Sequence, residues 1–305
     1  MNEFYEELDK LYGAGDLAAV EKLILDALAA AGESSMERAG LYNELAGFYR
    51  GVSRFDESGD AFERALDIFS SRGMGASPEY ATVLLNLAGL YRMKGEADKA
   101  VGLFLNAMKK LEDAGEEDSY AYVSVLNNLA LAYQEKREPG LAFDYASKAL
   151  SRMRGGEGNE HEIAVSLNNL AAIEISRGAA SDADAYITEA LALYDAMPEP
   201  NVHHAAALTT KGVLMCRGGD YRNALDCFRR ALDLTRHFFG ENIEYAACKR
   251  NIADVCAALG DTGAAISEQK EALRILERIH GADHPSAREA RAGLERLEQG
   301  LGNNE

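Results

Sequence analysis

Residues 126–133 read Leu126-Asn127-Asn128-Leu129-Ala130-Leu131-Ala132-Tyr133, and this stretch decides the fold. Within it, Leu129-Ala130 is followed three residues later by Tyr133, a spacing that forms one apolar stripe on an α-helix. We call this pattern the Leu-Ala motif. Its other copies, several with substitutions, are Leu45-Ala46-x-x-Tyr49, Leu87-Ala88-x-x-Tyr91, Leu170-Ala171-x-x-Glu174, Lys211-Gly212-x-x-Met215 and Ile252-Ala253-x-x-Cys256. The recurrence predicts a chain built from copies of one helical unit.

A second stripe follows each motif and fixes the period. It is marked by alanines at spacings of 38, 42, 42, 41, 41 and 41 residues: Ala27, Ala65, Ala107, Ala149, Ala190, Ala231 and Ala272. Small side chains at such places let two helices approach closely. A turn residue separates the two stripes: Gly15, Ser53, Gly95, Gly178, Gly219 and Gly260, with Arg137 as the exception. Each unit is therefore predicted to be helix, tight turn, helix.

Neither helix of such a unit can bury its apolar face alone, so neighbouring units must stack. We therefore predict an all-α fold, a right-handed α-solenoid of seven helix-turn-helix repeats with a C-terminal capping helix. It forms a single domain over residues 1–305. The repeats are expected at about 1–34, 39–72, 81–114, 123–156, 164–197, 205–238 and 246–279, and the capping helix at about 286–299.

Composition excludes several classes of function. The formal charge of −18 repels phosphate backbones and anionic lipid, so neither nucleic acid nor a membrane surface is an expected partner. No segment is long and apolar enough for a membrane span, and the acidic N-terminus is unlike a basic signal peptide. We therefore expect a cytoplasmic protein. Cys216, Cys227, Cys248 and Cys256 lie in helical patterns without a C-x-x-C pair, which favours buried thiols over zinc ligands.

These small-residue and aromatic patterns resemble the tetratricopeptide repeat over nearly the whole chain. The period of about 42 residues looks like the kinesin-light-chain subtype, as do Leu126-Asn127-Asn128-Leu129-Ala130, Leu167-Asn168-Asn169-Leu170-Ala171 and His280-Gly281-Ala282-Asp283-His284-Pro285. The resemblance implies that the first helix of each repeat lines a concave surface, which receives an extended peptide or a partner helix.

One residue before the Leu-Ala motif, asparagine recurs at Asn86, Asn128, Asn169 and Asn251. Asparagine is a mediocre helix former, so its recurrence at one place asks for a reason. An amide carries a donor and an acceptor and can bracket a peptide group of a ligand. By resemblance, Asn86, Asn128 and Asn169 match the groove asparagines of the family. The alternative is that these side chains are solvated or join neighbouring first helices.

Charge along the same face differs from that of the whole chain. Arg50, Arg92, Arg217 and Arg250 stand against Glu44, Glu135 and Asp254, a balance of +1. A nearly neutral groove favours a neutral or acidic protein segment as the ligand. The alternative is that these arginines are ordinary solvated side chains.

No phosphate-binding loop, nucleophile elbow or H-E-x-x-H motif occurs, and most histidines lie in or beside predicted loops. We therefore expect no catalytic residue, no metal ligand, no cofactor and no enzymatic activity. Three functions stay open: a scaffold that binds a linear segment, a regulator that senses a signalling peptide, and a structural protein that self-associates. The oligomeric state and the partner's identity are not predicted.

Overall fold

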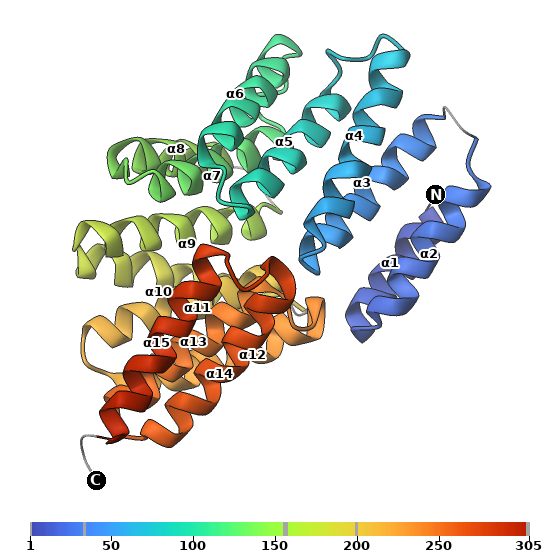
Figure 1. Cartoon of the computed structure of the whole chain (residues 1–305). Helices are drawn as coiled ribbons and strands as arrows, with labels where there is room; N and C mark the ends of the chain where they lie inside the picture. The colour runs from blue at the N-terminus through green and yellow to red at the C-terminus, as the bar shows by residue number, and fades with distance from the viewer. Residues whose placement is uncertain (1, 33–34, 155–157, 199–200, 303–305) are drawn as a thin grey trace. The chain divides into compact units, whose positions relative to one another are not determined.

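The computed structural model describes residues 2–32, 35–154, 158–198 and 201–302, and these are 84% helical with no strand (Figure 1). The predicted all-α fold is confirmed. The fifteen helices of the described residues are α1 (Asn2–Ala14), α2 (Leu17–Ala30), α3 (Met36–Gly51), α4 (Phe55–Ser71), α5 (Pro78–Met93), α6 (Ala97–Asp113), α7 (Tyr120–Glu135), α8 (Pro139–Met153), α9 (Glu160–Arg177), α10 (Ala180–Ala196), α11 (Val202–Arg217), α12 (Tyr221–Phe239), α13 (Ile243–Ala258), α14 (Thr262–His280) and α15 (Pro285–Gly302).

The helices fall into two compact units. Unit 1 comprises Met1–Leu11 and Ala18–Ala196, and unit 2 comprises Tyr12–Leu17 and Met197–Glu305. In unit 1, the hairpins α3/α4, α5/α6, α7/α8 and α9/α10 stack in chain order. In unit 2, the hairpins α11/α12 and α13/α14 stack in the same way, and α15 packs on α14 (Figure 1).

Polar side chains cap the N-termini of most first helices. Ser35, Ser77 and Ser119 each accept a hydrogen bond from the backbone N–H three residues later, and they start α3, α5 and α7. Asn201 and Asn242 cap α11 and α13. These caps add about one turn, so most repeats begin three residues before the boundary drawn from apolar spacing. The predicted boundaries at residues 1, 34 and 156 lie outside the described residues.

The turn inside each hairpin has one backbone conformation whatever its residue. The turn glycines have φ near +80°, as in Gly95, Gly178 and Gly219, and only glycine adopts this region without strain. Ser53 and Arg137 occupy the same region, with φ of 62° and 60°. Arg137 is therefore an exception in composition only, and the turn geometry is imposed by the helices on either side.

The small-residue stripe forms the closest contacts between helices. Six of its alanines have no exposed surface: Ala65, Ala107, Ala149, Ala190, Ala231 and Ala272. Large aromatic side chains on the same helices, Phe62, Phe104 and Phe228, are at most 2% exposed. Ala27, in the first repeat, is only partly buried. The alternation of small and large side chains thus sets the distance between helices.

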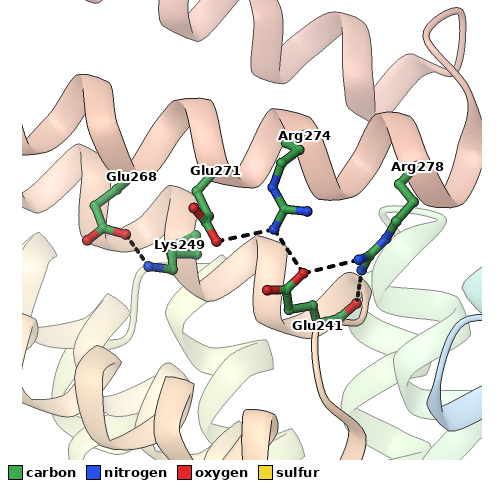
Figure 2. Close-up of polar contacts among 6 residues, drawn as sticks. All are labelled: Glu241, Lys249, Glu268, Glu271, Arg274 and Arg278. Atoms are coloured by element: carbon green, nitrogen blue, oxygen red, sulfur yellow. Dashed lines mark hydrogen bonds and ion pairs between the residues drawn. The ribbon is translucent and has the colours of Figure 1, made fainter.

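Ion pairs fix α13 within unit 2 (Figure 2). Glu241, just before α13, accepts hydrogen bonds from Arg274 at 2.8 Å and from Arg278 at 3.1 Å, both on α14. Lys249 of α13 lies 2.7 Å from the Glu268 carboxylate of α14. These contacts hold the start and the middle of α13 against α14.

None of the helices described here is both long and apolar enough to span a membrane.

Candidate functional site

The asparagines that precede the Leu-Ala motif are not equivalent. In unit 1, Asn169 of α9 is 3% exposed, and its amide donates to the Asn127 side chain of α7 at 3.1 Å. Asn127 in turn donates to Ser166 of α9 at 3.0 Å. This buried chain of polar groups joins two neighbouring first helices. Asn169 therefore differs from the exposed position expected from the pattern, because its amide is used inside the repeat stack.

A link of the same kind joins α3 and α5, but none joins α5 and α7 through Asn128. Asn86 of α5 donates to Asn43 of α3 at 3.0 Å. Asn128 of α7 would meet Leu85 at the corresponding place on α5, and leucine offers no polar atom. The Asn128 amide instead donates to the Ser124 carbonyl of its own helix at 2.9 Å. An asparagine before the motif is therefore paired when the previous repeat has an asparagine two residues before its own motif.

In unit 1, a second side chain also reaches from one first helix to the next. It stands five residues after the first residue of the motif, and we call this the crossing position. Arg50 of α3 donates to the Asn86 carbonyl at 2.9 Å, passing close to Gly89. Arg92 of α5 lies 2.6 Å from the Glu135 carboxylate of α7. Gln134 of α7 donates to the Ala172 carbonyl of α9 at 3.1 Å. Long side chains therefore close the gaps between the first helices of unit 1.

In unit 2, the contacts between α11 and α13 differ from those between the first helices of unit 1. The residue two before the motif of α11 is Thr209, whose hydroxyl donates to the Ala205 carbonyl at 3.0 Å and lies 3.7 Å from the Cys248 Sγ of α13. Within the part of the chain that the structure describes, the Asn251 side chain of α13 forms no hydrogen bond. The crossing position of α11 is occupied by Cys216, which is shorter than arginine or glutamine and packs against the apolar cluster of unit 2. The two helices also meet less closely than the first helices of unit 1.

A pocket of about 290 Å³ lies beside Cys216 and Asn251. Its lining residues come from α11, α12 and α13: Val213, Cys216, Arg217, Tyr221, Phe228, Asn251, Asp254 and Val255. Phe228 is buried and packs in one cluster with Val255, Val213 and Tyr221. An added Cβ on Gly212 would lie only 2.6 Å from the Phe228 ring, so glycine is needed for the ring to lie against α11. The pocket thus has apolar walls beside an amide with open hydrogen-bonding groups.

The rim of the pocket carries charges of both signs. Partial burial raises the pKa of Asp254, whereas Arg250 and Arg296 act in the opposite direction. Arg250 lies 3.2 Å from the Glu289 carboxylate of α15. Burial, and then the Asp254 carboxylate, raise the pKa of the Cys216 thiol, which keeps it neutral near pH 7. The rim therefore carries arginine and carboxylate side chains close together.

The structure brings together two of the predicted binding residues, Arg217 and Asn251, at this pocket. Arg250 lies on the same helix one residue before Asn251. The remaining five contact their own stack instead, as described above: Asn86, Asn128, Asn169, Arg50 and Arg92. The pattern of apolar residues missed Cys216 and Phe228. A comparison of the crossing position across repeats, where cysteine replaces arginine or glutamine, would have indicated the gap.

Comparisons with known proteins agree with the architecture. A family model described as "Tetratricopeptide repeat" matches residues 37–113 and 203–278. Among solved structures, BtubC (BKLC) from P. vanneervenii is 21% identical, with 78% of this chain and 94% of BtubC covered and a TM-score of 0.52. A Rap protein complexed with competence and sporulation factor is 14% identical over 100% of this chain and 99% of its own, with a TM-score of 0.58.

Another similar structure is the APC/C hetero-tetramer Cut9–Hcn1. It is 17% identical, the match covers 95% of this chain and 48% of that one, and the TM-score is 0.61. At these identities the similarity concerns the fold alone. No curated protein matches the chain in sequence.

Proposed function

We propose, from the premise that this chain belongs to the tetratricopeptide repeat family, that it is a non-catalytic scaffold that binds an extended segment of a partner protein along α11 and α13. The family fold is a protein-interaction fold. The finer proposal is that unit 2, rather than unit 1, presents the peptide-binding surface. This finer proposal depends on which of the first helices have side chains that can bind a ligand.

The observation that carries this proposal is the state of the Asn251 amide. Its counterparts Asn86 and Asn169 donate to neighbouring first helices, and Asn128 donates to its own helix. Within the described residues, Asn251 has no such partner, and it lies at the rim of an apolar pocket. An amide in that place can donate to and accept from one peptide group of an extended ligand. The pocket beside it can take a side chain of the same segment.

Charge supports a neutral or acidic partner segment. Unit 1 contains 33 acidic and 18 basic residues, a balance of −15, whereas unit 2 contains 17 and 14, a balance of −3. The acid excess of the chain therefore belongs to unit 1. Near the pocket, Arg217, Arg250 and Arg296 stand beside Asp254 and Glu289. A basic segment would meet this arginine excess, so a neutral or acidic one is favoured.

Selection of random linear peptides displayed on phage against the whole chain tests the proposal. Enriched peptides should bind the Asn251→Ala variant about threefold to tenfold more weakly, as expected for one or two lost hydrogen bonds. Asn128→Ala is the matched control, because its amide bonds only within its own helix. It should leave the affinity unchanged. The proposal fails if no peptide is enriched, or if both variants bind as well as the original chain.

The finer assignment to a kinesin-light-chain-like subtype rests on repeat length. The buried alanines from Ala65 to Ala272 follow one another at 41 or 42 residues, longer than the 34 residues of the common repeat. We infer a subtype with long inter-repeat loops. A location in the cytoplasm stays a prediction.

Two other functions from the sequence stay open as alternatives, a peptide-sensing regulator and a self-associating structural protein. A molar mass by light scattering tests the second. A mass that rises above that of one 33.1 kDa chain with concentration would support self-association over the scaffold.

A further inference from the structure

The imidazole rings of His280 and His284 lie against each other where α14 ends and α15 begins. Their centroids are 4.1 Å apart, and the ring planes are inclined by 16°. His280 is the last residue of α14, and His284 immediately precedes Pro285, the first residue of α15. We propose that this histidine pair is a pH-sensitive latch, which holds the capping helix α15 against α14 at neutral pH and releases it under mild acid. The latch is independent of the proposed peptide-binding function.

The neutral form of His284 caps the N-terminus of α15. The backbone N–H of Ser286 donates to His284 Nδ1 at 3.3 Å, and the Ser286 Oγ lies 2.7 Å from the same nitrogen. A backbone N–H can only donate, so Nδ1 must be unprotonated and the ring hydrogen must be on Nε2. Protonation of Nδ1 would remove this acceptor. It would also place a positive charge at the N-terminal end of α15, where the helix dipole disfavours it.

The place of His280 makes a positive charge on the pair still more costly. Partial burial, and then the neighbouring His284, lower the pKa of His280. A histidine whose pKa is lowered on folding stabilises the folded form above its ordinary pKa of about 6.5, and this contribution is lost as the pH falls through that value towards the lowered pKa. Two imidazolium rings in contact would also repel each other. Mild acid therefore opposes the docked arrangement at both rings.

Charged side chains on the elements around the pair leave the histidines to set the response. These side chains come from α14, the loop before α15, α15 itself and the start of α13: Glu277, Arg278, Asp283, Arg288, Arg291, Glu241 and Glu244. Glu277 accepts a hydrogen bond from Arg291, and Glu241 accepts one from Arg278 at 3.1 Å. Asp283 and Arg288 are exposed, so water and salt screen their charges. Glu277 and Glu241 are thus already bound to arginine.

The rest of α15 holds it only weakly, so a change at its N-terminus matters. Within the described part of this helix, the buried side chains are those of Ala287 and Ala290, which pack with Ile275 and Leu276 of α14. A methyl group buries little apolar surface. Gln269 of α14 is 4% exposed and donates to the Ala290 carbonyl at 2.7 Å. The ion pairs of α15 with α13 and α14 are partly exposed and contribute little. Release of the latch would therefore uncover this face of α14.

Amide hydrogen exchange of the whole chain, corrected for the intrinsic exchange rates, measures the opening of α15. Measurements at about pH 7.5 and about pH 5.5 lie on either side of the ordinary histidine pKa and above that of carboxyl groups, about 4. The opening equilibrium of α15 should rise about 5- to 30-fold at the lower pH, as expected for a lost cap and an unfavourable dipole. The internal control is α5, whose cap Ser77 does not titrate in this range, and its opening should not change.

Substitutions at the pair separate the latch from a general effect of acid. His284→Asn and His284→Asp provide caps that do not titrate in this range. Both should protect α15 at the higher pH as well as the original chain does, and the rise at the lower pH should fall below about twofold. His280→Gln removes one of the two charges and should keep only part of the response. An equal rise in α5 and α15, no rise in α15, or an unchanged response in both His284 variants would overturn the latch.

Discussion

Replacing Gly212 by alanine should reveal how closely Phe228 packs against α11. An ideal Cβ at Gly212 would lie 2.6, 2.8 and 2.9 Å from three carbons of the Phe228 ring. Carbon atoms in contact normally stay about 3.5–4.0 Å apart, so the ring would have to move by about 1 Å. The ring is 2% exposed and surrounded by buried side chains, so the overpacking should cost about 1–3 kcal/mol. Alanine gains about 0.8–1 kcal/mol over glycine in helix propensity, which leaves a net loss of about 0–2 kcal/mol.

A second glycine in a helix interior isolates the packing contribution. Gly102 of α6 has no atom within 4 Å of an added Cβ, so Gly102→Ala should raise the free energy of unfolding by about 1 kcal/mol. Urea denaturation followed by circular dichroism gives both values, and their difference should be about 1–3 kcal/mol. If Gly212→Ala stabilises the protein as much as Gly102→Ala does, the close contact with Phe228 is wrong. The shifted ring should also narrow the pocket, so peptide affinity should fall for Gly212→Ala only.

Three further predictions concern the repeat stack. Arg137→Gly should raise stability by about 0.5–1 kcal/mol in thermal or urea unfolding, because it relieves a left-handed backbone at φ of 60°; a loss of stability would contradict this. Asn169→Ala should lower the free energy of unfolding by about 0.5–1.5 kcal/mol through its lost inter-helix hydrogen bond, whereas Asn128→Ala should leave it equal or higher; equal effects would refute the distinction. The hydrogen bond from Arg274 lowers the pKa of Glu241, so this pair stabilises the fold above the unfolded carboxyl pKa, and the effect fades as pH falls through the folded value. Since both side chains are partly exposed, Glu241→Gln should remove only about 0.2–1 kcal/mol at pH 7 and nothing at pH 2, and an equal loss at both would count against the ion pair.

Arg137 and Gly212 both depart from the repeat pattern, but the structural consequences differ. Arg137 replaces the turn glycine, yet its backbone adopts the same left-handed conformation, because the two helices it joins pack against each other. Gly212 replaces the alanine of the motif, and its reason is visible only in Phe228, which comes from the next helix. The substitution at Arg137 therefore leaves the backbone of the turn unchanged, whereas the substitution at Gly212 accompanies closer packing of Phe228 against α11.

Local signals in the sequence were enough to predict the helical hairpins, their order, the small residues between paired helices and the turn residues. Apolar periodicity, small residues at Ala107 and Ala149 and the turn positions are local signals, and burial of those alanines follows wherever hairpins stack. The tertiary structure alone decided which asparagine is hydrogen-bonded to a neighbouring helix. Asn169 and Asn251 have the same place in the repeat, but one meets the Asn127 amide on the neighbouring helix and the other meets no partner among the described residues. That difference depends on a side chain from the previous repeat, about 40 residues away in sequence, and hydrogen bonding across such a distance is fixed only when the helices pack.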